Sequence, residues 1–303
     1  VLDGATESTL SLANVVPSDA ADYMVAVSNG AGRVESESIT LTVVQPASIV
    51  SQPEGGSAVL GEVFVMSVVT VGTEPISYQW HFGGQAMEGA TKSSLSLANV
   101  KAVNSGKYKV TVSNAAGSET SDTVTLSVES PPVMTELTES LSAVEGESVE
   151  LSVTAVGTVP ITYQWSKGGV VLDGATESTL SLANVVPSDA ADYMVAVSNG
   201  AGRVESNLIA LNVIQPVVIV SQPVPAVAAI GDKAVFGVSV TGSVPISYQW
   251  EFNGEPLANQ SAAKLVIENV SPIDGGTYTV TATNASNSVK SEGVEVPTIT
   301  PPI

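Results

Sequence analysis

The chain has 303 residues, of which 44% are hydrophobic and 13% charged, and thirty acidic residues against ten basic ones give a net charge of −20. This balance excludes a basic stripe for nucleic acid and argues equally against docking on anionic lipid. Cysteine is absent, which excludes disulfides, thiolate metal sites and cysteine nucleophiles. No run approaches the ~18 apolar residues of a membrane span.

A repeat of 85 residues organises the sequence. The three tryptophans, Trp80, Trp165 and Trp250, are evenly spaced (165 − 80 = 85 and 250 − 165 = 85). Residues 1–36 also recur letter for letter as residues 171–206, two units later, as the duplication of a two-unit block would leave them. We therefore expect half a unit at residues 1–44, followed by complete units at residues 45–129, 130–214 and 215–303.

The unit at residues 130–214 shows the predicted elements most clearly. Apolar and polar side chains alternate over residues 149–153 and again over 161–165, which is typical of strands with one buried face. Further strands are expected later in the unit, at residues 180–182, 193–197 and 204–213. About seven short strands per unit, with no sustained helical period, predict an all-β fold of tandem β-sandwiches.

Glycine and asparagine mark the expected turns. The pair Gly168-Gly169 suits a two-residue hairpin, because both positions of that turn need positive φ. The corresponding pairs in the other units are Gly83-Gly84 and Asn253-Gly254. A second turn is expected before residue 204, with a left-handed backbone at Gly202. The residues that match Gly202 elsewhere are Gly32, Gly117 and Asn287.

Two motifs recur in register along the chain. The middle unit carries Pro160-Ile161-Thr162-Tyr163-Gln164-Trp165 and then Asp189-Ala190-Ala191-Asp192-Tyr193, followed by Asn199-Gly200-Ala201-Gly202. With these motifs the whole chain resembles the immunoglobulin superfamily, and most closely the bacterial I-set-like tandem repeats, here without the intersheet disulfide.

The resemblance implies a set of core residues. One tryptophan in each complete unit is expected to be buried on strand C: Trp80, Trp165 and Trp250. One tyrosine in each unit is expected to form a tyrosine corner, with its hydroxyl bonded to nearby backbone: Tyr23, Tyr108, Tyr193 and Tyr278. Valines take the positions of the family's paired cysteines: Val68 with Val110, Val153 with Val195, and Val238 with Val280. Buried valines can replace much of the ~2–5 kcal/mol of a disulfide, so we expect the fold to form without oxidation.

Side chains that could carry chemistry are scarce. His81 is the only histidine, and strand parity places it on the outer face without a base partner or co-ligands. Asp189 and Asp192 could contribute to an ion site, but a turn cap beside the tyrosine is the favoured interpretation because Asn104 takes the place of Asp189 one unit earlier. Lys167, beside an exposed turn, does not favour an isopeptide bond. We therefore predict no catalytic, cofactor-binding or metal-binding residues, and no enzyme.

The function expected from this pattern is that of a stalk or adhesion region in an extracellular or cell-surface protein, with an unknown protein or glycan as ligand. Binding would use exposed loops or strand edges. Two alternatives stay open: an accessory region of a secreted, carbohydrate-active enzyme, and a structural subunit of a surface fibre. The discriminating observation is whether an anchor, further repeats or a hydrolase domain lies in the complete reading frame.

We expect the units to form a linear array with small interfaces, because the junctions are short and no unit has a spare apolar face. Residues 1–44 should not fold alone, since they supply only strands near Leu10, at residues 23–27 and at residues 39–43, and the other half of that unit is expected upstream. Because residues 1–36 repeat the segment that completes the middle unit, they could replace it in another copy. This predicts possible self-association through residues 1–44.

Overall fold

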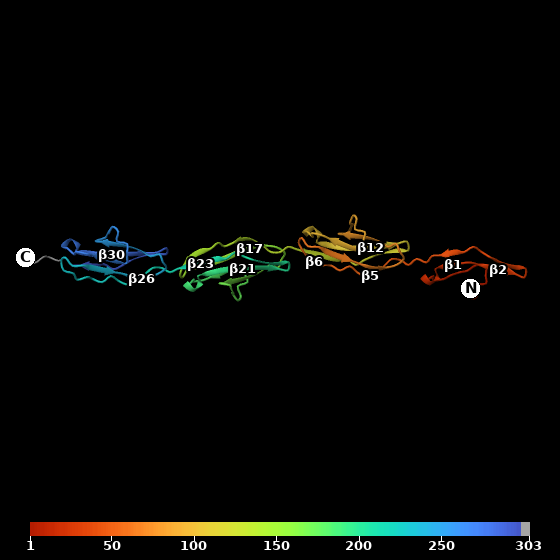
Figure 1. The fold of residues 1–303 in the computed structure, drawn as a ribbon, viewed down its shortest axis with the longest axis horizontal. Helices are drawn as coiled ribbons and strands as arrows, with labels where there is room; N and C mark the ends of the chain where they lie inside the picture. Colours follow the sequence, from red (N-terminus) through yellow and green to blue (C-terminus); the bar gives the residue numbers. More distant parts are fainter. Residues whose placement is uncertain (298–303) are drawn as a thin grey trace, which may run out of the picture. The chain divides into compact units, whose positions relative to one another are not determined.

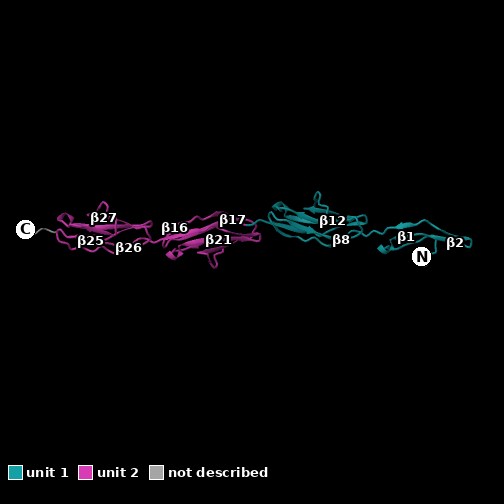
Figure 2. Cartoon of the chain, in the orientation of Figure 1, with its two compact units in different colours: residues 1–131 teal, residues 132–303 magenta. Residues whose placement is uncertain are grey.

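The computed structural model describes residues 1–297 of the chain, which fall into two compact units, residues 1–131 and the described part of residues 132–303 (Figure 2). The described residues form strands and four single-turn 3-10 helices (Figure 1). Their buried apolar side chains gather in three separate cores, at residues 47–126, 143–211 and 234–296. The chain is therefore all-β, with several sandwiches in tandem.

Residues 1–44 carry four short strands and one helical turn: η1 (Pro17–Asp19), β1 (Ala21–Tyr23), β2 (Ala26–Asn29), β3 (Gly32–Glu35) and β4 (Ile39–Leu41). Strand β1 pairs with β4, and β2 pairs with β3. None of these 44 residues is buried. The strand expected near Leu10 is wrong, because no strand is formed there; in the middle domain the same sequence is a strand only by pairing with a neighbour that residues 1–44 do not include.

The first complete domain contains the following elements: β5 (Ser48–Ser51), β6 (Gly56–Val59), β7 (Phe64–Ser67), β8 (Val69–Val71), β9 (Ser77–Phe82), β10 (Gln85–Ala86), β11 (Ser94–Leu97), η2 (Ala102–Asn104), β12 (Gly106–Asn114), β13 (Gly117–Thr120) and β14 (Val124–Glu129). One sheet runs β10-β9-β12-β14-β6, with β13 also on β12. On the other side of the core, β5 pairs with β8 and β7 with β11. The two layers enclose Trp80 and its apolar neighbours.

The middle domain repeats this order with these elements: β15 (Val133–Leu137), β16 (Leu141–Val144), β17 (Val149–Val156), β18 (Thr162–Lys167), β19 (Val170–Val171), β20 (Thr179–Leu182), η3 (Pro187–Asp189), β21 (Ala191–Asn199), β22 (Gly202–Glu205) and β23 (Ile209–Ile214). One sheet is β15-β17-β20, and the other runs β16-β23-β21-β18-β19 with β22 on β21. Residues of β17 alternate between buried and exposed, as the sequence pattern predicts for a strand that covers a core on one face.

The third domain contains these elements: β24 (Val218–Ser221), β25 (Ala234–Gly237), β26 (Ser239–Thr241), β27 (Ser247–Phe252), β28 (Glu255–Pro256), β29 (Lys264–Ile267), η4 (Pro272–Asp274), β30 (Gly276–Thr283), β31 (Ser288–Lys290) and β32 (Val294–Val296). One sheet runs β28-β27-β30-β31 with β32 on β30, and the opposite layer pairs β24 with β26 and β25 with β29. The same two-layer plan therefore holds in all three complete domains.

The two expected turns have different outcomes. The hairpin pairs take positive φ at both positions, as in Gly168 (55°) and Gly169 (81°). The left-handed backbone expected at Gly202 is wrong, because neither it nor its counterparts have positive φ. Instead, Asn199 Oδ1 accepts the N–H groups of Ala201 (3.0 Å) and Gly202 (3.1 Å). An asparagine side chain thus builds this turn without left-handed glycine.

The expectation that no unit has a spare apolar face is also wrong. On the first complete domain Val65, Val69 and Val71 are 56%, 57% and 55% exposed. They alternate along β7 and β8 with the buried Met66 and Val68, and so they lie on the outer side of that layer. Strand parity fixed the inward side correctly, but it does not require polar residues on the outward side.

Candidate functional site

The three tryptophans lie at the centre of the three cores with no exposed surface. Each indole Nε1 donates to a backbone oxygen 12 residues later, as Trp165 does to Glu177 at 2.9 Å. Each tryptophan is also paired across the sheet with a valine: Val110 with Trp80, Val195 with Trp165, and Val280 with Trp250. The indoles are buried and hydrogen-bonded, so they belong to the packing of the fold and not to an exposed binding surface.

The six valines at the expected cysteine positions are all buried. Their exposed fractions are 5% and 0% for Val68 and Val110, 4% and 0% for Val153 and Val195, and 8% and 0% for Val238 and Val280. Each pair contributes apolar contact between the two layers, where a disulfide would supply a covalent link. Burial of each valine stabilises the fold by roughly 1.5–3 kcal/mol.

A glutamine beside each tryptophan fixes the adjoining hairpin, a role that the sequence analysis missed. Gln164 Nε2 donates to the backbone oxygens of Trp165 (3.1 Å) and Leu172 (2.8 Å). Gln79 and Gln249 make the equivalent bonds in the other two domains. The recurrence of glutamine before every tryptophan is the signal that could have revealed this role.

The tyrosine hydroxyls donate to the backbone oxygen four residues earlier. The distances are 2.7 Å for Tyr23, 2.8 Å for Tyr108, 2.9 Å for Tyr193 and 3.0 Å for Tyr278. The last three are buried, whereas Tyr23 is half-buried. Burial raises the pKa of Tyr108 and Tyr193, and desolvation together with the charge of Asp274 raises the pKa of Tyr278 to about 12. These raised pKa values mean that the buried sites favour the neutral, protonated hydroxyl of each tyrosine.

Asp189 caps the turn before its tyrosine. Its Oδ2 accepts the Val186 N–H at 3.0 Å, and its Oδ1 accepts from Lys167 Nζ at 2.8 Å. The hydrogen bond from Lys167 and the bond from the Val186 amide hold the pKa of the Asp189 carboxyl below its usual range. Asn104 makes the same backbone bond in the first complete domain, to the Lys101 N–H at 2.8 Å. An uncharged amide therefore performs the same task, which fits a cap and does not require an ion.

His81 follows the buried Trp80 on β9 and is itself partly buried. The neighbouring strands β10 and β12 place Ala86 and Lys109 directly opposite it. Its Nδ1 has no hydrogen-bond partner. Within residues 1–297, no three histidine, cysteine or acidic side chains come together as a metal site would need. Nor does any helix in this part of the chain have the length and apolar character to cross a bilayer.

Asparagine also ties the entering chain to its domain, which was not anticipated. In the first complete domain Asn114 Nδ2 donates to the backbone oxygens of Gln45 (2.7 Å) and Thr73 (2.8 Å). The Gln45 N–H in turn donates to Thr73 Oγ1 at 2.8 Å. A Cβ at Gly72 would lie 2.8 Å from the Pro46 oxygen, so glycine is needed where the entering chain crosses.

The third domain repeats this arrangement. Asn284 Nδ2 donates to the backbone oxygens of Gln215 (2.8 Å) and Ser243 (3.0 Å), and the Gln215 N–H donates to Ser243 Oγ at 2.8 Å. The same asparagine oxygens accept the hairpin amides two and three residues later, as at Ser286. One side chain therefore shapes the hairpin and holds the entering chain against it.

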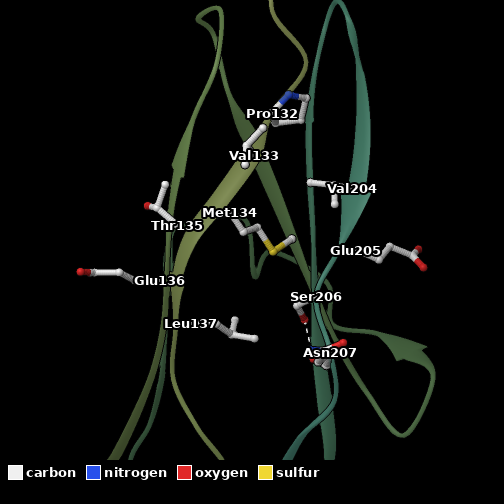
Figure 3. A pocket seen from close by; sticks show the side chains of 10 residues that line it. All are labelled: Pro132, Val133, Met134, Thr135, Glu136, Leu137, Val204, Glu205, Ser206 and Asn207. Carbon is white, nitrogen blue, oxygen red and sulfur yellow. Dashed lines mark hydrogen bonds between the residues drawn. The ribbon is translucent and has the colours of Figure 1, made fainter.

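A groove opens on the side of the middle domain, between strand β15 and the hairpin strand β22 (Figure 3). It has a volume of about 410 Å³. Met134, Leu137 and Val204 supply apolar side chains to it, and Glu136 and Glu205 lie at its rim. No lysine or arginine is among its lining residues. This is an open groove between two strand edges.

Known proteins identify the repeated domain. Residues 131–199 and 215–284 match the immunoglobulin domain model, and residues 47–128 match the immunoglobulin I-set domain model. The three complete domains are immunoglobulin domains. In solved structures the fold is similar to the "I-band fragment I67-I69 from titin", with a TM-score of 0.70 at 22% identity over 83% of this chain and 98% of that one.

Two relatives show where such domains occur. The chain is 33% identical over 216 residues to the basement membrane-specific heparan sulfate proteoglycan core protein of Mus musculus, covering 66% of this chain and 6% of that protein. It is 28% identical over 180 residues to the cell adhesion molecule DSCAML1 of Gallus gallus, covering 55% of this chain and 9% of that protein. The chain is thus a region of immunoglobulin repeats, and it spans less than a tenth of the length of either relative.

Proposed function

We propose that this chain is a non-catalytic stalk or adhesion region of an extracellular or cell-surface protein. The observation that carries the proposal is that each complete domain closes its own core around a buried tryptophan. In the first and third domains, side chains also tie the entering chain to the domain. Domains that each enclose their own core can be joined in series without loss of stability. This suits a stalk, which holds another part of a protein at a distance.

The extracellular location is supported by the two relatives, one named for basement membrane and the other for cell adhesion. The net charge of −20 keeps a long chain soluble and speaks against a nucleic-acid partner. Membrane insertion is not part of the proposal. The bacterial origin suggested by the resemblance rests on the recurring sequence motifs, and it stays a prediction.

We place the domain boundaries at residues 45–129, 130–214 and 215–303, with a half domain at residues 1–44. The support is that each core cluster falls within one of these ranges. Limited proteolysis should cut at the junctions near residues 44, 130 and 215 before it cuts within a domain. Cleavage inside β12, β21 or β30 at the same rate would contradict these boundaries.

The function is tested by presenting the whole chain to arrays of glycans and extracellular-matrix proteins. Saturable binding to one class supports adhesion through that ligand, whereas no binding leaves the spacer role of the stalk. Turnover of a glycan by the purified chain would refute the non-catalytic assignment. An end-to-end polymer of the chain in electron micrographs would instead favour the fibre subunit, and an adjoining hydrolase domain in the reading frame would favour the accessory region.

A further inference from the structure

The first strand of each complete domain has one edge that is not covered by a neighbouring strand, and two of the three domains close it with side chains. In the first complete domain Glu119 of β13 accepts from Ser48 Oγ at 2.8 Å and from the Ile49 N–H at 2.9 Å. In the third domain Asn287 Oδ1 accepts the Val217 N–H at 2.7 Å, and its Nδ2 donates to the Val217 oxygen at 3.1 Å. A hairpin residue therefore bonds to the first strand in the first complete domain and to the residue just before it in the third.

A second tie lies further along the same edge. Gln52 Oε1 accepts the Asp122 N–H at 2.9 Å in the first complete domain. Gln222 Oε1 accepts the Glu292 N–H at 2.9 Å in the third domain. Each glutamine bridges the first strand to the residue that follows the hairpin strand, so each of these two domains carries two bridges between its layers at this side.

The middle domain has apolar residues where the two bridges of the first complete domain begin, and Gly202 where the Asn287 bridge of the third domain begins. Val204 stands 85 residues after Glu119, and Leu137 stands 85 residues after Gln52. Neither side chain can accept or donate a hydrogen bond. The Asn207 N–H, equivalent to that of Asp122, has no side-chain acceptor among the described residues. The groove of about 410 Å³ lies at this place.

Both walls of the groove are strand edges that can accept another strand. Among the described strands, β15 is hydrogen-bonded only to β17, and β22 only to β21. Val133 and Met134 pair with Val156 and Ala155 in the register that Ser48 and Ile49 keep with Val71 and Thr70. The Met134 N–H therefore faces the groove, as the Ile49 N–H faces Glu119.

The side chains of the groove define what it would accept. Met134 points into the space between β15 and β22, while Glu136 and Glu205 point outward on opposite sides (Figure 3). Met134, Leu137 and Val204 can cover one row of apolar side chains, and the two carboxylates favour positive charge at the rim. Arg203 is paired with Glu205, but it does not line the groove.

We propose that this groove binds an extended peptide segment of another protein by β-strand addition, with alternate apolar side chains against Met134 and Val204 and basic residues near Glu136 and Glu205. An uncovered strand edge is a liability that folded proteins usually close, and main-chain pairing along such an edge is an established way to bind a peptide. A second copy of this chain is disfavoured as the occupant, because it would bring a further net charge of −20 to an acidic rim.

The proposal goes beyond the stalk or adhesion role and stands apart from it, since it concerns one domain and one edge. The test uses the full chain and a short peptide in which valine and threonine alternate between terminal lysines, with its alternately N-methylated form as the non-pairing control. We expect the unmethylated peptide to bind and to protect the Met134 and Asn207 amides from hydrogen exchange. Equal binding of both forms, or no change at these amides with millimolar peptide, would overturn the proposal.

Substitutions that give the middle domain the bridging residues of the first complete domain provide a matched comparison with the unmodified chain. The double substitution Leu137→Gln with Val204→Glu restores both bridges, and it should weaken peptide binding about tenfold or more, because it removes an apolar wall and occupies both edges. The added carboxylate would attract a basic peptide, so a loss of affinity cannot come from charge. The converse pair, Gln52→Leu with Glu119→Val, should open a second site on the first domain.

Unchanged affinity in the restored variant, with hydrogen exchange showing that it is folded, would refute the groove as the binding site. Sedimentation of the chain alone distinguishes the other occupant: a dimer that Leu137→Gln with Val204→Glu dissociates would show that a second copy fills the groove, and it would refute the separate partner. If the restored variant does not fold, the amide protection of the unmodified chain decides the question.

Discussion

A glycine beneath an aromatic ring can be tested in depth, because the repeats contain their own control. In the first complete domain Phe82 packs on Tyr108 with ring centroids 4.8 Å apart. A Cβ at Gly106 would lie 2.6 Å from Phe82 Cε2 and 3.1 Å from Cζ. Carbon atoms in contact prefer about 3.5–4.0 Å, so Gly106→Ala must displace the ring by roughly 1 Å.

The expected cost of Gly106→Ala is about 1–3 kcal/mol. Overpacking of this kind typically costs ~1–3 kcal/mol, and displacement of the ring also weakens an aromatic pair worth ~0.5–1.5 kcal/mol. The lower unfolded-state entropy of alanine returns about 0.5–1 kcal/mol. Native-state hydrogen exchange in the whole chain measures the effect: the Val110 amide should exchange faster, while the Val195 amide in the middle domain serves as the internal reference.

The middle domain predicts how to rescue this variant. There the equivalent residues are Lys167 and Ala191, and Lys167 Nζ lies 5.8 Å from the centre of the Tyr193 ring. Because a lysine side chain can move aside, Gly106→Ala should cost less when it is combined with Phe82→Lys, and the two substitutions should show a coupling energy. A backbone cost remains in both backgrounds, since Gly106 has a φ of 156°. Equal costs of Gly106→Ala with phenylalanine and with lysine would refute the steric argument.

The remaining predictions concern pH, core packing and shape. Since the pKa of Tyr278 in the folded state is raised from 10.0 to about 12, its contribution to stability is complete below pH 10 and is lost as pH rises through 12. The loss in the free energy of unfolding should be about 2–3 kcal/mol. The variant Tyr278→Phe should lack this loss when unfolding by urea is measured at alkaline pH. The Ile49 N–H lowers the pKa of Glu119 below 4.5, so its stabilisation is present above that value and lost as pH falls through the lower folded pKa; Glu119→Gln should flatten the acid limb of hydrogen exchange in the first domain. Trp165→Ala should cost roughly 3–5 kcal/mol in denaturant unfolding of the middle domain. Small-angle scattering should give the length distribution of a linear array, and a compact particle would contradict that expectation.

Much of the fold could be predicted because period-two alternation and repeat length are local properties of the sequence. The strand that contains Trp165 and the hairpin at Gly168-Gly169 are examples, since parity and turn chemistry act over a few residues. Fold class followed from their repetition. Burial of one sheet face requires apolar residues at alternate positions, and positive φ favours glycine or asparagine. Both features can therefore be recognised directly from the residue types.

The polar ties were harder to predict because they join residues far apart in the chain. Asn114 and Gln45 are separated by 69 residues, and Glu119 and Ile49 by 70. A single sequence gives no register between such segments until the layers are packed. The open groove was missed for the same reason, since Val204 and Leu137 look like ordinary apolar residues until they are compared with Glu119 and Gln52.

The identical segments at residues 1–36 and 171–206 show how far structure depends on the partner strand. In the middle domain Leu180 pairs with Leu151 of β17, whereas the equivalent Leu10 lies outside any strand. Val195 and Val197 are fully buried, but Val25 and Val27 are 51% and 65% exposed. The sequence alone therefore does not determine burial here; access to β17 and to the rest of its core does.

This comparison leads to the last prediction. Residues 1–36 have the same sequence as the segment that pairs with β17, so in another copy they can take its place with the same side-chain contacts. Sedimentation should reveal a dimer at high concentration that disappears when residues 1–44 are deleted. The full-length variant Leu10→Asp is a sharper control, because it damages only the incoming segment and leaves Leu180 intact. A dimer that survives both changes, or a monomer whose residues 1–44 are protected from exchange like a folded domain, would contradict self-association through this segment.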